Sequence, residues 1–127
     1  MFVTMLQVAA GGAIGASGRY LSGVALIRFL GSNFPYGTMF VNVIGSFLMG
    51  FFAIYLLERM DGSFTRYAPF LMTGLLGGFT TFSAYSLDAL YLIERGRYMA
   101  ATLYMGGSVL VALLGLFIGM SLARTLA

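Results

Sequence analysis

A few hydrogen-bond donors in an otherwise apolar chain are the groups with which this sequence could do chemistry. Arg19, Asn42, Tyr104 and Ser108 lie in long stretches that hold few other polar side chains. Such groups are costly inside a membrane, so they are candidates for a functional site by default. A guanidinium is always charged, and an amide side chain offers two N–H donors. Placed together in a membrane, these donors suit a small anion.

Each of these residues also has a purely structural interpretation. Arg19 is explained equally by a side chain that reaches the membrane surface or ties two helices together. Thr38 and Asn42 are four residues apart and share a helix face, where an amide also serves for an interhelical hydrogen bond. The hydroxyl of Ser108 can bond the carbonyl one turn earlier in its own helix. The residues alone leave both interpretations open.

The stretch "GLLGGFTTFSAYS", residues 74–86, interrupts an apolar segment with glycines and hydroxyl residues. Gly77 and Gly78 each cost about 1 kcal/mol in a helix interior and allow unusual backbone angles. Thr80, Thr81 and Ser83 follow and suit the start of a new helix. The pattern predicts two half-helices broken near 77–81. The first would end in carbonyls that suit a hard cation, and the second would begin with N–H groups that favour an anion.

Phe82 and Tyr85 stand directly after this break, three residues apart on one helix face. The edge of an aromatic ring is electropositive, so ring edges turned toward a narrow path attract an anion weakly. Ordinary core packing is the alternative.

Composition places the chain in a membrane and excludes most catalytic chemistry. Of its 127 residues, 60% are hydrophobic and 9% are charged, and the mean hydropathy is +0.93. The sequence has no cysteine and no histidine and only four carboxylates. Zinc sites and Ser/His or Cys/His nucleophile pairs are therefore excluded, and no enzyme is expected. No basic cluster suggests nucleic acid.

The expected fold is an all-α integral membrane protein with a single domain over residues 1–127. A helix needs roughly 20 apolar residues to cross a bilayer. Short connections separate four candidate spans, and the alternating pattern of a β-barrel is absent. The spans cover about 2–28, 36–57, 67–93 and 98–123.

The flanking charges set no preferred orientation. Four spans put both termini on one side, and three arginines lie on each side: Arg59, Arg66 and Arg124 against Arg28, Arg95 and Arg97. Orientation normally follows the excess of such charges. The tie has two explanations, chance in a chain with few charges or insertion of copies in both directions, which then pair antiparallel.

Every span carries small residues four apart, which let helix backbones approach closely in lipid. The pairs are Gly11 and Gly15, Ser46 and Gly50, Gly74 and Gly78, and Gly115 and Gly119. We interpret them as favouring a tightly packed oligomer, with a two-fold dimer the commonest solution.

Three motifs in order, "GGAIGASGRY", "GTMFVNVIGSF" and "TGLLGGFTTFSAYS", resemble those of the Fluc (CrcB) fluoride channels over the whole chain. The resemblance implies an antiparallel, dual-topology homodimer with two pores in the bacterial inner membrane. Channels of this family export cytoplasmic fluoride passively. The resemblance also implies a structural sodium ion (Na+) at the dimer axis, held by the carbonyls of Gly77 and Thr80. The implied fluoride pathway comprises Arg19, Thr38, Asn42, Phe82, Ser83, Tyr85, Tyr104 and Ser108.

The sequence departs from the family pattern at a few positions. Tyr85 stands where the family usually has phenylalanine, Ala84 replaces a usual threonine, and Asp88 replaces a common glutamate. In the family, the row of hydroxyl side chains along the fourth span, which Tyr104 and Ser108 match here, usually continues at the position of Ala112. This row is therefore shorter in this chain.

Two other classes share the small four-span plan. A proton-coupled small multidrug exporter needs a carboxylate within the membrane, and only Asp88 lies near a span, at its end. A non-transporting accessory protein would be recognised by a deletion strain that is insensitive to fluoride.

Overall fold

The described chain, residues 1–59 and 66–126 of a computed structural model, is helical and contains no strand. The third predicted span is divided into two half-helices. The elements are α1 (Phe2–Leu30), α2 (Tyr36–Ile54), a π-helical turn (Tyr55–Arg59), a π-helical segment (Pro69–Leu76), α3 (Gly77–Phe79), α4 (Phe82–Glu94) and α5 (Tyr98–Leu126).

These helices occupy the four ranges that the sequence predicts, and glycine and proline set their ends. Gly31 ends α1 with a φ of 84°, a left-handed conformation that favours glycine, and its N–H bonds the carbonyl of Ile27. Pro35 then precedes α2. Gly96, with a φ of 75°, turns the chain from α4 into α5. Most of the predicted connection 58–66 lies outside the described residues.

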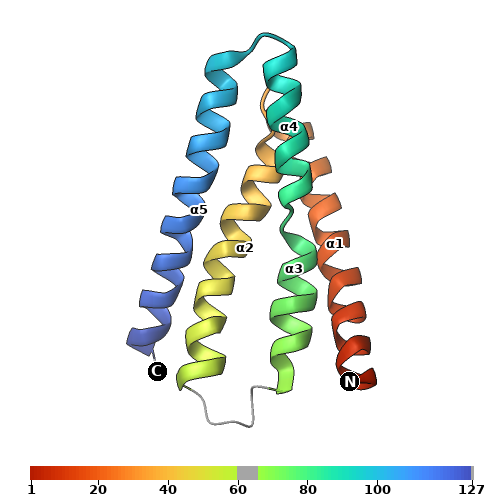
Figure 1. Ribbon diagram of the computed structural model, residues 1–127, viewed down its shortest axis with the longest axis vertical. Helices are drawn as coiled ribbons and strands as arrows, with labels where there is room; N and C mark the ends of the chain where they lie inside the picture. Colours follow the sequence, from red (N-terminus) through yellow and green to blue (C-terminus); the bar gives the residue numbers. More distant parts are fainter. Residues whose placement is uncertain (60–65, 127) are drawn as a thin grey trace.

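The helices run the length of the molecule, with both termini at one end and the α1–α2 and α4–α5 loops at the other (Figure 1). Two of them, α2 and α5, are each long and apolar enough to cross a membrane. The helix α1 has 29 residues but carries Arg19, and the interruption divides the third span. That all four ranges cross a bilayer stays a prediction.

The tightest packing joins α1 to the third span and α2 to α5. Gly11 and Gly15 of α1 are buried, and a Cβ atom at either would overlap the backbone of Phe70 or Leu75. A Cβ at Gly119 of α5 would likewise overlap the backbone of α2 at Phe47. The missing side chains of these glycines admit a neighbouring helix of the same chain. The glycines therefore do not by themselves support an oligomer, which stays a prediction.

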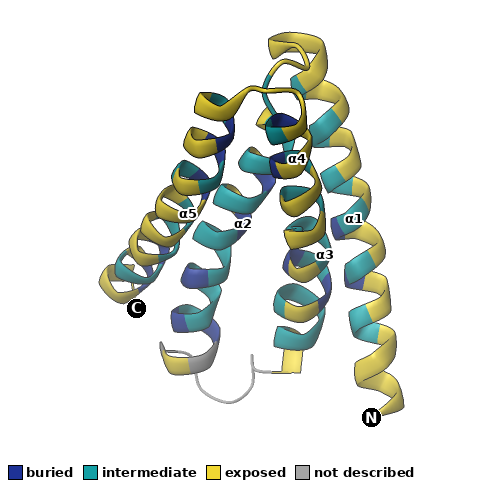
Figure 2. Cartoon of the chain, turned by 45° about the horizontal axis from the view of Figure 1, so that its top comes forward, coloured by how far each residue is buried: buried dark blue, intermediate teal, exposed yellow. Residues whose placement is uncertain are grey.

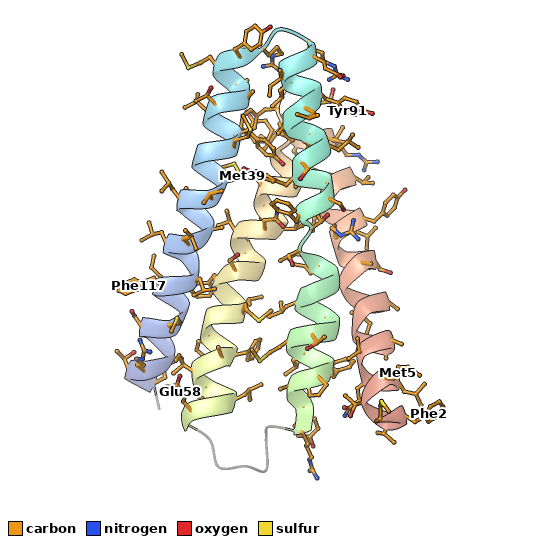
Figure 3. The ribbon with its side chains drawn as sticks, viewed as in Figure 1. Phe2, Met5, Met39, Glu58, Tyr91 and Phe117 are labelled. Atoms are coloured by element: carbon orange, nitrogen blue, oxygen red, sulfur yellow. The ribbon has the colours of Figure 1, made fainter. Side chains whose placement is uncertain are left out.

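The outer surface of this bundle is apolar. Figure 2 shows exposed residues along the outer sides of α1 and α5, and Figure 3 shows Phe117 pointing away from the bundle on α5. Among the exposed large side chains are Phe2, Ile14, Leu110, Leu114 and Phe117. A water-soluble monomer rarely exposes so much contiguous apolar surface, so this surface fits lipid or a second copy.

Gly15→Ala should destabilise the protein, because its Cβ would meet backbone that cannot move aside. Overpacking of this kind costs about 1–3 kcal/mol. Gly106→Ala is the matched control, since a Cβ at that α5 glycine meets nothing within 4 Å. We expect a lower thermal unfolding midpoint in detergent for Gly15→Ala only. Equal midpoints for the two variants would contradict the close approach of α1.

Candidate functional site

The third span is interrupted at Thr80 and Thr81, inside the stretch where the sequence predicts a break. Thr80 is extended, with φ and ψ of −87° and 160°, and Thr81 has −154° and 118°. The helix α4 then starts with Thr81 as its N-cap, whose hydroxyl oxygen accepts a bond of 3.1 Å from the N–H of Ala84. The N-cap chemistry of threonine therefore starts the second half-helix.

The glycines before the break have a different role from the one expected. Gly77 is helical, with φ and ψ of −63° and −37°, and no described residue other than Gly31 and Gly96 has a positive φ. The predicted use of their conformational freedom was therefore wrong. Gly78 is needed for space instead, because a Cβ there would lie 2.8 Å from the carbonyl oxygen of Gly12 in α1.

Two side chains from neighbouring helices bind the interrupted backbone. Arg19 of α1 donates from Nε to the carbonyl of Gly78 at 3.0 Å. Asn42 of α2 bonds Thr81 twice: its Oδ1 accepts from the Thr81 N–H at 2.7 Å, and its Nδ2 donates to the Thr81 carbonyl at 3.0 Å. Both residues therefore make the interhelical bonds that the sequence left as alternatives, and one amide N–H of Asn42 remains for another partner.

The same bonds redirect two amide donors away from helical carbonyls. In a continuous helix the N–H of Thr81 would bond the carbonyl of Gly77, and the N–H of Ala84 that of Thr80. Here these donors bond Asn42 Oδ1 and Thr81 Oγ1. The carbonyls of Gly77 and Thr80, the pair implied for sodium, thus lack the donors that a continuous helix provides.

A groove of about 310 Å³ lies beside the break, and α2, α4 and α5 form its walls. Its lining combines amide, hydroxyl and aromatic groups and includes no charged side chain. The lining residues are Asn42, Gly45, Ser46, Met49, Thr80, Thr81, Phe82, Tyr85, Ser108, Val109, Ala112 and Leu116.

Three aromatic rings form a row from this groove toward the α4–α5 loop. The ring centroids of Phe82 and Tyr85 are 5.6 Å apart, and those of Tyr85 and Tyr104 are 5.3 Å apart. Phe82 is 78% exposed, whereas Tyr104 is fully buried. Tyr85 belongs to the groove lining, and its hydroxyl donates to the carbonyl of Met105 in α5 at 2.9 Å.

Ser108, a residue of the groove lining, has a buried hydroxyl without a hydrogen-bond partner. It is 4% exposed, and its Oγ is the one buried side-chain polar atom without a hydrogen-bond partner in the described part of the chain. Ser86 and Thr102 do bond the carbonyl four residues earlier, but Ser108 does not. A buried polar group without a partner is costly, so this hydroxyl is a candidate to bind a water molecule or a ligand.

Asp88 is a site residue that the sequence reasoning missed. Its Oδ2 accepts hydrogen bonds from Thr38 at 2.8 Å and from Tyr104 at 3.2 Å. Asp88 and Thr38 also line a pocket of about 230 Å³ beside the α4–α5 and α1–α2 loops. The available signal was its spacing, because Asp88 follows Tyr85 by three residues and so shares its helix face.

The structure gathers most of the predicted pathway residues, but in separate places. Asn42, Phe82, Tyr85 and Ser108 line the groove, while Thr38 and Tyr104 bind Asp88 nearer the loops. Two further predicted residues belong neither to the groove lining nor to the Asp88 bonds. Arg19 bonds the break from α1, and Ser83 is exposed, with its hydroxyl 3.3 Å from that of Thr81.

Known proteins match this chain over nearly its whole length. A family model described as CrcB-like protein, Camphor Resistance (CrcB), matches residues 6–120. A protein named fluoride-specific ion channel FluC from Cereibacter sphaeroides is 56% identical over 98% of this chain and 97% of its own length. Those of the same name from Ruegeria sp. and Rhizobium meliloti are 51% identical (98% of this chain, 97% of theirs) and 47% identical (96% and 97%). The chain therefore belongs to the CrcB family.

Proposed function

We propose that this protein is a fluoride-selective channel that lets fluoride leave the cytoplasm down its electrochemical gradient. The observation that carries the proposal is the buried, unpartnered hydroxyl of Ser108, a residue that lines a groove together with two aromatic side chains and an amide. The names of the relatives support the same function. They do not favour a proton-coupled multidrug exporter, and they name channels rather than enzymes.

The groove offers a chemical reason for passage of an anion without tight binding. Fluoride is small and strongly hydrated, so a pathway must replace water with close donors. Ser108 supplies an O–H, Asn42 has one N–H that the Thr81 bond does not use, and Phe82 and Tyr85 supply electropositive ring edges. No charged residue lines the groove. The anion therefore meets donors that stabilise it but no fixed cation that would hold it.

A second copy of the chain completes the pathway in this proposal. One copy leaves the groove open beside Phe82, which is 78% exposed. We infer that two copies, inserted in opposite directions, cover each other's grooves and form two pores. The equal arginine counts on the two sides support this arrangement. The wide apolar surface also leaves room for both a partner and lipid.

The residues at the break fit a structural sodium ion. Carbonyl oxygens are suitable ligands for a hard cation, and the carbonyls of Gly77 and Thr80 lack their usual helical donors. Within the described residues, no group of three or more His, Cys, Asp or Glu side chains offers an alternative metal site. In an antiparallel pair, two breaks at the two-fold axis would supply carbonyls from both copies. Bound there, sodium would hold the breaks together.

The setting of this function would be the inner membrane of a bacterium, crossed by all four spans. Fluoride enters an acidified cell as neutral HF, which dissociates and leaves the anion inside. A conductive path then allows the membrane potential to drive fluoride out. No energy coupling is required, which agrees with a groove whose lining holds no carboxylate or other charged side chain.

The purified protein in liposomes should release fluoride and not chloride, as followed with ion-selective electrodes. Ser108→Ala should lower fluoride release by at least about tenfold, because it removes a donor to a charged ligand. Ser86→Ala is the control, since that hydroxyl only bonds the carbonyl of Phe82 in its own helix. Equal chloride release by the wild type, or none of either ion, would refute the channel.

Asn42→Ala should abolish most flux and also lower the unfolding midpoint, because it removes both bonds to the Thr81 backbone. A backbone group left unpaired in a buried place costs about 1–3 kcal/mol. Asn33→Ala, an exposed asparagine in the α1–α2 loop, is the control. A wild-type midpoint in Asn42→Ala, measured by thermal denaturation, would show that the break does not depend on Asn42.

Replacing sodium by a large organic cation should reduce fluoride flux and the stability of the dimer. Thr80→Val is the control variant. It removes the bond from the Thr80 hydroxyl to the Leu76 carbonyl but keeps the Thr80 carbonyl, which is the proposed sodium ligand. Its sodium dependence should therefore persist. Size-exclusion chromatography and flux measured across a sodium titration provide the test. Full activity in thoroughly sodium-free buffer would argue against the site.

A further inference from the structure

The hydrogen bond between Tyr85 and Met105 spans a gap between two diverging helices. α4 and α5 meet at their short loop and separate away from it (Figure 1). Tyr85 lies near the start of α4, about ten residues from that loop. Its hydroxyl donates to the Met105 carbonyl at 2.9 Å. A carbonyl already bonded within a helix has a second lone pair for such a donor.

This bond fixes the ring relative to the polar face of α5. Met105 follows Tyr104 directly and precedes Ser108 by three residues. The Tyr85 ring also lies between Phe82 and Tyr104, at centroid separations of 5.6 and 5.3 Å. Packing alone lets a ring rotate about χ2, since that torsion has a broad minimum. A hydroxyl anchored across the gap restrains the tilt of the ring and sets the edge that faces the groove.

The bond also decides what Tyr85 offers to a ligand. A tyrosine hydroxyl has a single hydrogen to donate, and here it is used on Met105. The ring edge of Tyr85 therefore remains available to the anion, but the hydroxyl hydrogen of Tyr85 does not.

We propose that Tyr85 is a positioning residue, whose hydroxyl anchors the ring edge to α5 and is not itself a ligand for fluoride. The inference rests on the proposed channel function. It predicts that loss of the hydroxyl misplaces the ring and so lowers maximal flux. The fluoride concentration that half-saturates flux should stay the same.

Tyr85→Phe should lower maximal fluoride flux about two- to tenfold, the range that one net hydrogen bond supports. Tyr85→4-aminophenylalanine keeps a donor at the same position and should restore most of that flux. Tyr98→Phe, at a side chain 66% exposed at the start of α5, is the control and should leave flux unchanged. Wild-type flux in Tyr85→Phe would overturn the proposal, as would a marked rise in the half-saturating concentration.

Carbon-13 NMR separates an anchor from a ligand independently of flux. In protein labelled at the Met105 carbonyl, Tyr85→Phe should shift the Met105 signal. Added sodium fluoride should leave the Met105 signal of the wild type in place, because the anchoring bond persists when fluoride is present. A Met105 signal that moves with fluoride toward its position in Tyr85→Phe, or one that ignores Tyr85→Phe, would overturn the anchor. A wild type that conducts no fluoride would refute the channel function instead, since the Met105 shift reports the bond alone.

Discussion

The structure depends on a single constraint, which is that backbone groups at an interrupted helix within a membrane must find partners inside the protein. Around the break these partners come from three sources: Arg19 of α1 for the Gly78 carbonyl, Asn42 of α2 for Thr81, and the hydroxyl of Thr81 for the Ala84 N–H. Two of the rare polar side chains of the spans are thus used on backbone. Arg19 and Asn42 are placed where they reach the break, and the break is stable because these side chains bond its backbone groups.

The same bonds give the break two chemical characters. Donors that would have continued the helix are redirected, which leaves the carbonyls of Gly77 and Thr80 without their helical donors and so free for the proposed cation. Beyond the break, α4 presents Phe82 and Tyr85 toward α5, where the Ser108 hydroxyl lies. A short stretch of backbone therefore separates a region suited to a cation from one suited to an anion. The two regions share their supports, so changes to Arg19 or Asn42 affect both.

The sequence was sufficient to predict the helices and the position of the break, because hydropathy, glycine, proline and N-cap threonine act locally. Helical spacing also pointed to Phe82, Tyr85 and Ser108, which line one groove, although their role in a fluoride path stays a prediction. The sequence could not predict the partners of Arg19 and Asn42, since a donor that suits an anion equally suits a carbonyl until the neighbouring helix is placed. Asp88 was missed because its hydroxyl partners lie 50 residues before it and 16 after it. The glycine pairs predicted close approach of helices, but spacing does not reveal which helix approaches.

The packing of glycine against backbone has a consequence for biosynthesis. The tightest neighbours are not consecutive in the chain, because α1 packs on the third span and α2 packs on α5. During synthesis, the surface around Gly11 and Gly15 must wait for residues 70–79, and that around Gly50 must wait for Leu116 and its neighbours. The first two helices are therefore made before the helices that fit most closely against them. Assembly of the bundle is completed only when α5 has been made. A ribosome that stalls before α5 therefore leaves a fragment in which the face of α2 around Gly50 has no partner helix.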